Sequence, residues 1–156
     1  MSGLAGLLSC NLDVALALGS TAVYAGIDRV ELIEFSRILA TGGDEFLGTV
    51  YTEGERGQSG DRLERLATRF AAKEAASKAL GTGLRGISPT EIEVVSADNG
   101  QPQLRLHGRA RERAETLGIV SMSVSLTHTS MAAEALVVAL AATVTSRSSL
   151  RKDSAL

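Results

Sequence analysis

A carboxylate on the apolar face of a predicted helix is the first group in this chain that could do chemistry. Residues 69–83 read RFAAKEAASKALGTG. At about 100° per residue, Glu74 falls on the apolar stripe that Leu66 and Phe70 begin. A carboxylate on a buried face is costly unless it is paired or bound to a metal. Pairing with Lys78, four residues further on, is one interpretation, but it leaves unexplained why Glu74 faces the core.

A second carboxylate, Asp28, ends an apolar run over residues 22–28 (AVYAGID) that predicts a buried strand. Taken alone, Asp28 favours a turn or a helix cap over a ligand. Together with Glu74 it supplies two carboxylates from different elements. Proteins commonly contribute one or two carboxylates to a Mg²⁺ site whose other ligands are water and substrate phosphates. The pair therefore predicts a metal site made by Asp28 and Glu74.

Cations and glycines surround Glu74 in the sequence. Lys73 and Lys78 are expected to project to either side of it, and Gly81 and Gly83 follow the predicted end of the helix. Lysine supplies a point charge for a phosphate, and glycine lets the backbone approach a phosphate closely. Because the helix dipole disfavours anions at its C-terminal end, the lysines and the metal would have to do most of the phosphate binding.

A histidine lies near the end of a strictly alternating segment. In residues 121–129, SMSVSLTHT, His128 shares one face with Leu126. One interpretation is a buried histidine that bonds to a neighbour. The other is a phosphate contact or an acid–base group, helped by the hydroxyls of Thr127 and Thr129.

The elements that position these residues follow from hydrophobic periodicity and turn signals. Their order predicts an α+β fold, with an antiparallel-leaning sheet and helices packed on one face. In chain order the predicted elements are a strand over 22–28, a helix over 31–40, a turn at 41–46, a surface loop over 52–61, a helix from about 62 to 80 with Asp61 as its N-cap, a hairpin of strands 92–96 and 103–107, a helix over 109–118, and strands over 121–129 and 133–144.

Length and composition indicate one domain. The chain has 156 residues, of which 44% are hydrophobic and 3% aromatic, so the core must consist mainly of aliphatic side chains. We expect the domain over residues 22–143, preceded by an extension over 1–21. The polar tail, 144–156, is expected to be disordered.

Charge and cysteine content exclude several classes of protein. The net charge of −2 gives no general electrostatic case for nucleic-acid binding, although residues 105–113 hold a local group of arginines. The apolar N-terminal stretch is too short and too interrupted to span a membrane. The single cysteine, Cys10, cannot form an internal disulfide and favours a reducing, cytoplasmic setting.

Three short motifs, in this order, resemble those of the 4′-phosphopantetheinyl transferase superfamily. They are GID at 26–28, FAAKEAASKALGTG at 70–83 and SLTHT at 125–129. The GQP turn at 100–102 also fits. Length and spacing are similar to the small holo-acyl-carrier-protein synthase type, and the resemblance covers about residues 22–143.

The resemblance implies transfer of the 4′-phosphopantetheine arm of coenzyme A to a serine of an apo carrier protein, with adenosine 3′,5′-bisphosphate as the other product. It implies that Asp28 and Glu74 hold Mg²⁺, that Lys78 neutralises charge on the phosphates, and that Glu74, directly or through water, takes the serine proton. Arg69, Lys73, Gly81, Gly83, His128 and Thr129 would line the coenzyme A site, with Pro102 near the adenine.

The resemblance also implies partners. The small type forms homotrimers with active sites between subunits, and it grips an acidic carrier with a basic residue six positions after the motif aspartate. Here that residue is Glu34, with Arg37 one turn away. This departure favours a different carrier, such as a polyketide or peptide synthase domain, or docking through residues 105–113. Two alternatives stay open: a non-catalytic coenzyme A-binding or scaffold module, and a structural helix with salt-bridged lysines.

Overall fold

The computed structural model describes residues 21–60 and 62–142. The predicted N-cap Asp61, the tail and almost all of the N-terminal extension lie outside the described residues. The elements are, in chain order, β1 (Thr21–Glu31), α2 (Leu32–Val50), α3 (Glu53–Ser59), α4 (Leu63–Ala79), the short 3₁₀ helix η1 (Pro89–Glu91), β2 (Ile92–Ser96), β3 (Pro102–Leu106), α5 (Gly108–Thr116), β4 (Ile119–His128) and β5 (Ala132–Ala142).

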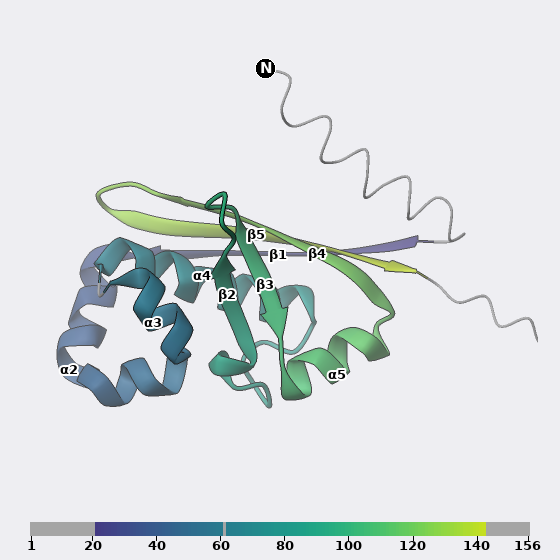
Figure 1. Cartoon of the computed structure of the whole chain (residues 1–156), viewed down its shortest axis with the longest axis horizontal. Helices are drawn as coiled ribbons and strands as arrows, with labels where there is room; N and C mark the ends of the chain where they lie inside the picture. Colours follow the sequence, from purple (N-terminus) through teal and green to yellow (C-terminus); the bar gives the residue numbers. More distant parts are fainter. Residues whose placement is uncertain (1–20, 61, 143–156) are drawn as a thin grey trace, which may run out of the picture.

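The fold is a long antiparallel sheet covered on one face. Its strand order is β1-β5-β4, and β2 and β3 form a separate hairpin. Figure 1 shows the helices and the hairpin together on one face of this sheet, while no described element covers the other face. The predicted α+β class, the hairpin and the assignment of the final segment to a strand are confirmed.

Helix α4 is the centre of the packing. It lies against β1 and β5, and it also contacts β2, α2 and α3. Alanines at 71, 72, 75, 76 and 79 are almost completely buried, and their small side chains let the helix approach the sheet closely. The closest approach is at Gly26 of β1, where an added Cβ would overlap the carbonyl oxygen of Ala75. This contact fixes β1, and with it Asp28, against α4.

Gly26→Ala should therefore destabilise the protein. The methyl group would meet backbone rather than a side chain that can move aside, and overpacking of this kind costs about 1–3 kcal/mol or more. Urea unfolding followed by circular dichroism measures the loss. Gly48→Ala is the matched control, because a Cβ there meets nothing within 4 Å, and alanine in a helix should gain up to about 1 kcal/mol. Equal stability of the two variants would contradict the close approach.

Two segments differ from the sequence prediction. Helix α2 does not stop at residue 40 but continues to Val50 through a kink at Gly43, which has φ 50° and ψ −142°. The left-handed φ suits glycine, and this non-helical residue lies within the predicted turn at 41–46. The chain therefore does break there, but helical structure resumes after the break and runs to Val50, which the prediction did not include. Strand β1 also continues three residues beyond Asp28, which places Asp28 inside the strand rather than at its end.

The predicted surface loop over 52–61 is wrong as well, because it contains helix α3. Thr52 caps this helix through a capping box: its hydroxyl accepts from the backbone N–H of Glu55, and the Glu55 carboxylate accepts from the backbone N–H of Thr52. The helix ends at Gly60, which has a left-handed φ of 57°. The abundance of glycine and polar residues in this segment concealed a short, well-capped helix.

Candidate active site

Asp28 and Glu74 lie in the same hollow. Asp28 comes from β1 and Glu74 from α4, and both line a space of about 320 Å³. Apolar side chains complete its wall, among them Phe35 and Phe70. The close packing of α4 on β1 brings the two carboxylates together, although 46 positions separate them in the sequence. Their predicted juxtaposition is therefore what the fold produces.

The charges in this hollow interact. Partial burial raises the pKa of Glu74, the negative charge of Asp28 raises it further, and the nearby cation of Lys78 opposes both. Lys78 does not form the ion pair with Glu74 that one interpretation of the sequence offered. Its Nζ instead lies 2.7 Å from Asp28 Oδ1 and 2.9 Å from the carbonyl oxygen of Ile27. Within the described part of the chain, the Glu74 carboxylate has no ion-pair partner.

The donor set of the hollow fits a hard divalent cation. Burial is the main cause of the raised pKa of Glu74, and the charge of Asp28 adds to it; a metal ion shared by the two carboxylates would offset both effects. Carboxylate oxygens are ligands that Mg²⁺ prefers, and Mg²⁺ keeps several water or phosphate ligands. Over residues 21–60 and 62–142, no group of three or more His, Cys, Asp or Glu side chains could hold a metal.

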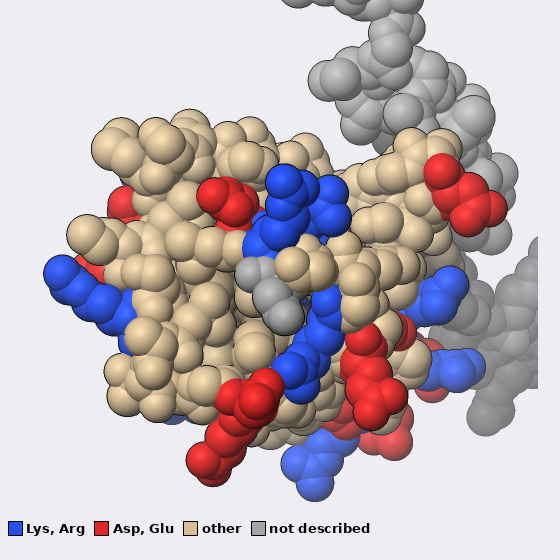
Figure 2. All heavy atoms as spheres, turned by 60° about the vertical axis from the view of Figure 1, so that its left-hand side comes forward, with Lys and Arg blue, Asp and Glu red and all other residues tan. Residues whose placement is uncertain are grey.

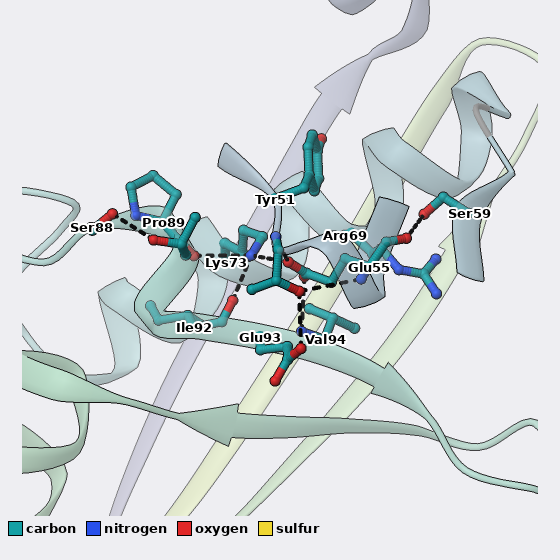
Figure 3. Close-up of polar contacts among 12 residues, drawn as sticks. Tyr51, Glu55, Ser59, Arg69, Lys73, Ser88, Pro89, Ile92, Glu93 and Val94 are labelled. Atoms are coloured by element: carbon teal, nitrogen blue, oxygen red, sulfur yellow. Dashed lines mark hydrogen bonds and ion pairs between the residues drawn. The ribbon is translucent and has the colours of Figure 1, made fainter. Parts of the chain in front are cut away.

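The prediction for Lys73 differs from the structure. Its side chain is fully buried, and its Nζ donates to Glu55 Oε2 at 2.8 Å, to the Pro89 carbonyl at 2.9 Å and to the Ile92 carbonyl at 2.6 Å. Figure 3 shows this ammonium group among Glu55, Pro89 and Ile92. With all three donors in use, Lys73 has none left for a phosphate of coenzyme A.

Glu55 is the residue of this network that sequence reasoning missed. Its carboxylate is completely buried and also accepts from the backbone N–H groups of Thr52 and Val94, each at 2.9 Å. Burial lowers the pKa of Lys73, and the charge of Glu55 opposes that shift. The pair joins α3, α4 and β2. The capping-box spacing of Thr52 and Glu55 was the available signal.

The Gly81–Gly83 loop ends α4 rather than presenting free donors. The N–H of Gly81 donates to the carbonyl of Lys78 at 3.0 Å, and those of Thr82 and Gly83 donate to the carbonyl of Ser77 at 3.2 and 3.3 Å. Both glycines have left-handed φ values, 73° and 57°, as helix C-terminal motifs require. These backbone donors are occupied, so the predicted close approach of a phosphate has no free N–H groups here.

His128 lies on the helix-facing side of β4, at the same end of the sheet as Asp28. It pairs in register with Ala133 of β5, two residues from the Asp28 partner Ala135. Strand β5 separates it from β1, and His128 does not line the hollow of Asp28 and Glu74. The side chain is exposed, so the interpretation as a buried histidine is wrong.

Thr129 is occupied in the β4–β5 turn. Its hydroxyl oxygen accepts from the backbone N–H groups of Met131 and Ala132, at 3.1 and 3.2 Å. Its own N–H donates to the Ala132 carbonyl. The residue therefore shapes the turn that follows His128.

A comparison with models of known protein families identifies the family of this chain. The model of the 4′-phosphopantetheinyl transferase superfamily matches residues 24–141. The chain belongs to this superfamily. The match covers β1 to β5, and thus every element that builds the hollow of Asp28 and Glu74.

Two curated relatives are holo-[acyl-carrier-protein] synthases. A holo-[acyl-carrier-protein] synthase of Herpetosiphon aurantiacus is 43% identical over 125 residues, which cover 76% of this chain and 98% of the relative. One from Chloroflexus aurantiacus is 44% identical over 135 residues, with the same coverage.

Solved structures of the superfamily share the fold. The holo-[acyl-carrier-protein] synthase of Neisseria meningitidis has a TM-score of 0.68 at 36% identity, covering 74% of this chain and 96% of its own. The enzyme of Helicobacter pylori, solved with coenzyme A, has a TM-score of 0.68 at 28% identity, covering 74% and 98%.

Two further residues expected from the superfamily resemblance lie away from the hollow. Arg69 is 6% exposed, and its Nη2 lies 3.4 Å from the hydroxyl of Ser96. Its Nε has no hydrogen-bond partner among the residues that the structure describes. Pro102 begins β3 and lines a different space, of about 300 Å³, with Met122 and Val124 of β4. The fold therefore does not gather the predicted coenzyme A residues in one place: Lys73 and Arg69 are buried, whereas Pro102 and His128 lie away from the hollow.

Proposed function

We propose that this protein transfers the 4′-phosphopantetheine group of coenzyme A to a serine of an apo acyl carrier protein, releasing adenosine 3′,5′-bisphosphate. The observation that carries the proposal is the meeting of Asp28, Glu74 and Lys78 at one hollow, in a chain 43–44% identical to holo-[acyl-carrier-protein] synthases over about three quarters of its length.

In the proposed reaction the serine oxygen attacks the phosphorus that bears the pantetheine arm. The bond from that phosphorus to the bridging oxygen breaks, and its electron pair leaves with adenosine 3′,5′-bisphosphate. Glu74 takes the serine proton, a role that its raised pKa suits. Such transfers depend mainly on positioning and on charge stabilisation.

Asp28 and Glu74 would hold Mg²⁺, which when bound supplies positive charge to the pyrophosphate. Lys78 is exposed enough to turn from Asp28 toward a phosphate, since its side chain is 50% accessible. Its flexible stem suits that movement. The dependence on Mg²⁺ is part of the proposal and rests on the two carboxylates.

Incubation with coenzyme A, Mg²⁺ and a panel of apo carrier proteins, followed by mass spectrometry, tests the function. We expect a covalent mass gain on at least one carrier, and loss of the gain with EDTA. Folded protein that modifies no carrier would contradict the proposal. Coenzyme A binding in calorimetry without any turnover would instead favour the non-catalytic binding or scaffold module.

We also propose that the protein is a homotrimer that works in the cytoplasm. The support for the trimer is the uncovered face of the sheet, where Val23, Ile27 and Leu136 are 64%, 67% and 44% exposed. The register places Ile27 beside Leu136 and Val23 beside Leu140, so the apolar patch lies over β1 and β5. Contiguous apolar patches of this kind commonly mark protein interfaces.

The cytoplasmic setting rests on the single cysteine and stays a prediction. No described helix is long and apolar enough to cross a membrane.

Ile27→Glu should convert the trimer to monomers. A carboxylate on this apolar patch would lose its water on association. Light scattering after gel filtration measures the mass against the 16.2 kDa chain. Ile33→Glu is the matched control, because Ile33 is also 64% exposed but lies on α2. A wild-type protein that is already monomeric would contradict the trimer.

A further inference from the structure

The carboxylate of Glu74 depends on its helix for its position. From the residues that the structure describes, this carboxylate receives neither an ion pair nor a hydrogen bond. Its place in the hollow with Asp28 is therefore set by the distance of α4 from β1 and by the rotation of α4 about its own axis. The close approach of Gly26 to Ala75 sets the distance. A different contact has to set the rotation.

The apolar packing around Glu74 defines this rotation only weakly. From position 71 to position 76, every buried side chain of α4 other than Lys73 is an alanine. Alanine methyl groups make small contacts that have no preferred direction. A rotation of about 10° moves a group about 5–6 Å from the helix axis by about 1 Å. A displacement of about 1 Å can lower the rate of an enzyme about 100-fold, so the rotation of α4 matters for the transfer.

Lys73 makes the directional contacts that alanine cannot make. It immediately precedes Glu74, so the two side chains leave the helix about 100° apart. Glu74 lines the hollow, whereas the Nζ of Lys73 donates to Glu55 and to two backbone carbonyls, at distances from 2.6 to 2.9 Å. Hydrogen bonds with charged partners are short and depend on angle. Turning α4 would break them.

Glu55 is itself held by two other elements. Its carboxylate accepts from the backbone N–H of Val94 in β2 and from that of Thr52 at the start of α3. Figure 3 shows the bonds of Glu55 with Lys73 and Val94. On the side of the molecule that bears α2 and α3, Figure 2 shows acidic and basic side chains at the surface, where water and salt weaken their interactions. Glu55 and Lys73 are 0% exposed, so their interaction is screened much less.

We propose that Glu55 is a positioning residue for phosphopantetheine transfer. Its ion pair with Lys73 sets the rotation of α4 and so holds Glu74 in the hollow with Asp28. Glu55 does not line the hollow, and it acts only through α4. This inference rests on the proposed function. It gives the buried network a role in turnover as well as in stability.

A single and a double variant separate positioning from stability. Glu55→Gln leaves the ammonium group of Lys73 without its counter-charge and should lower both stability and kcat. In the double variant with Lys73→Met no buried charge remains, so part of the lost stability should return. The double variant still lacks the directional bonds, so its kcat should stay about 10- to 100-fold below that of the wild type. Mass spectrometry of the carrier measures the rate, and urea unfolding measures the stability.

Two further readouts distinguish positioning from a structural role. The KM for the carrier should not change in the double variant, because Glu55 and Lys73 are buried and cannot touch the carrier. Calorimetry with Mg²⁺ in the presence of coenzyme A should show weaker binding of the ion, since the double variant no longer holds Glu74 in place. A purely structural pair would leave both kcat and Mg²⁺ binding unchanged in folded protein.

Ile119→Ala is the matched control for lost stability. Ile119 packs against the core cluster, but its partner in β5 is Ala141, towards the opposite end of that strand from the Asp28 partner Ala135. Folded Ile119→Ala should keep the wild-type kcat. A double variant that regains stability and turnover together would overturn this inference and leave the proposed function standing, as would one that stays as unstable as Glu55→Gln. A wild-type protein that modifies no carrier would overturn both.

Discussion

Glu74→Gln should remove phosphopantetheine transfer without unfolding the protein. The substitution keeps the shape of the side chain but removes a carboxylate that we propose as metal ligand and as base. Loss of one such group typically costs about 100- to 1,000-fold in turnover. The rate is measured by mass spectrometry of the carrier. Calorimetry with Mg²⁺ in the presence of coenzyme A gives a second readout, in which the variant should bind the ion more weakly.

The stability of Glu74→Gln should equal or exceed that of the wild type. Burial and the charge of Asp28 raise the pKa of Glu74 in the folded state, so ionisation of this group opposes folding. The wild type should therefore lose stability as the pH rises from the ordinary glutamate pKa through the raised one. Glutamine does not ionise, so the variant should lack this loss.

Glu64→Gln, in the first turn of the same helix, is the control and should leave turnover unchanged. An unfolded Glu74→Gln variant would contradict this account of the hollow and return Glu74 to a structural role. Full activity in a folded variant would remove Glu74 from the proposed mechanism.

Lys73→Met should be among the most destabilising substitutions in the chain. It leaves the fully buried carboxylate of Glu55 without its cation and the carbonyls of Pro89 and Ile92 without their donor. Removing one partner of a buried ion pair typically costs about 3–5 kcal/mol. Urea unfolding measures the change. The double variant with Glu55→Gln should recover part of the loss, since no buried charge then remains.

Lys78→Met is the matched control for stability. Lys78 also pairs with a carboxylate, but its side chain is 50% exposed, and exposed pairs contribute about 0–1 kcal/mol. The two substitutions should therefore have different effects. Lys73→Met lowers the free energy of unfolding, whereas Lys78→Met lowers turnover with little effect on that free energy. If Lys73→Met is as stable as wild type, the buried network does not exist as described.

The contrast between the two lysines shows where helical periodicity fails. The pattern of residues 69–83 correctly indicated a helix and an inward-facing glutamate, but it treated Lys73 and Lys78 alike. Helix α4 is enclosed by the sheet, by the hairpin and by α2 and α3, so it has no single apolar face. Which lysine is buried depends on Glu55, 18 positions away, and no local pattern contains that partner.

Helix α3 is a second segment where the local sequence pattern failed to predict the structure. Residues 52–61 are rich in glycine and polar side chains, which on average indicates a loop. The capping box is local and could be read from Thr52 and Glu55. The contacts that fix Glu55 in the core come from Lys73 and Val94, 18 and 39 positions away. Long-range contacts of this kind override weak local propensity.

By itself, the sequence determined the class of fold, the strands and main helices, and the pair of carboxylates with Lys78 beside them, because these follow from periodicity and from motif spacing. Only the tertiary structure decided that Lys73 turns inward, that the Gly81–Gly83 loop uses its donors to end α4, and that His128 lies two strands from Asp28. The reason is physical. Alternation and helical spacing record which way a side chain faces within its own element. The occupancy of its donors and its distance from other groups depend on elements that are remote in the sequence.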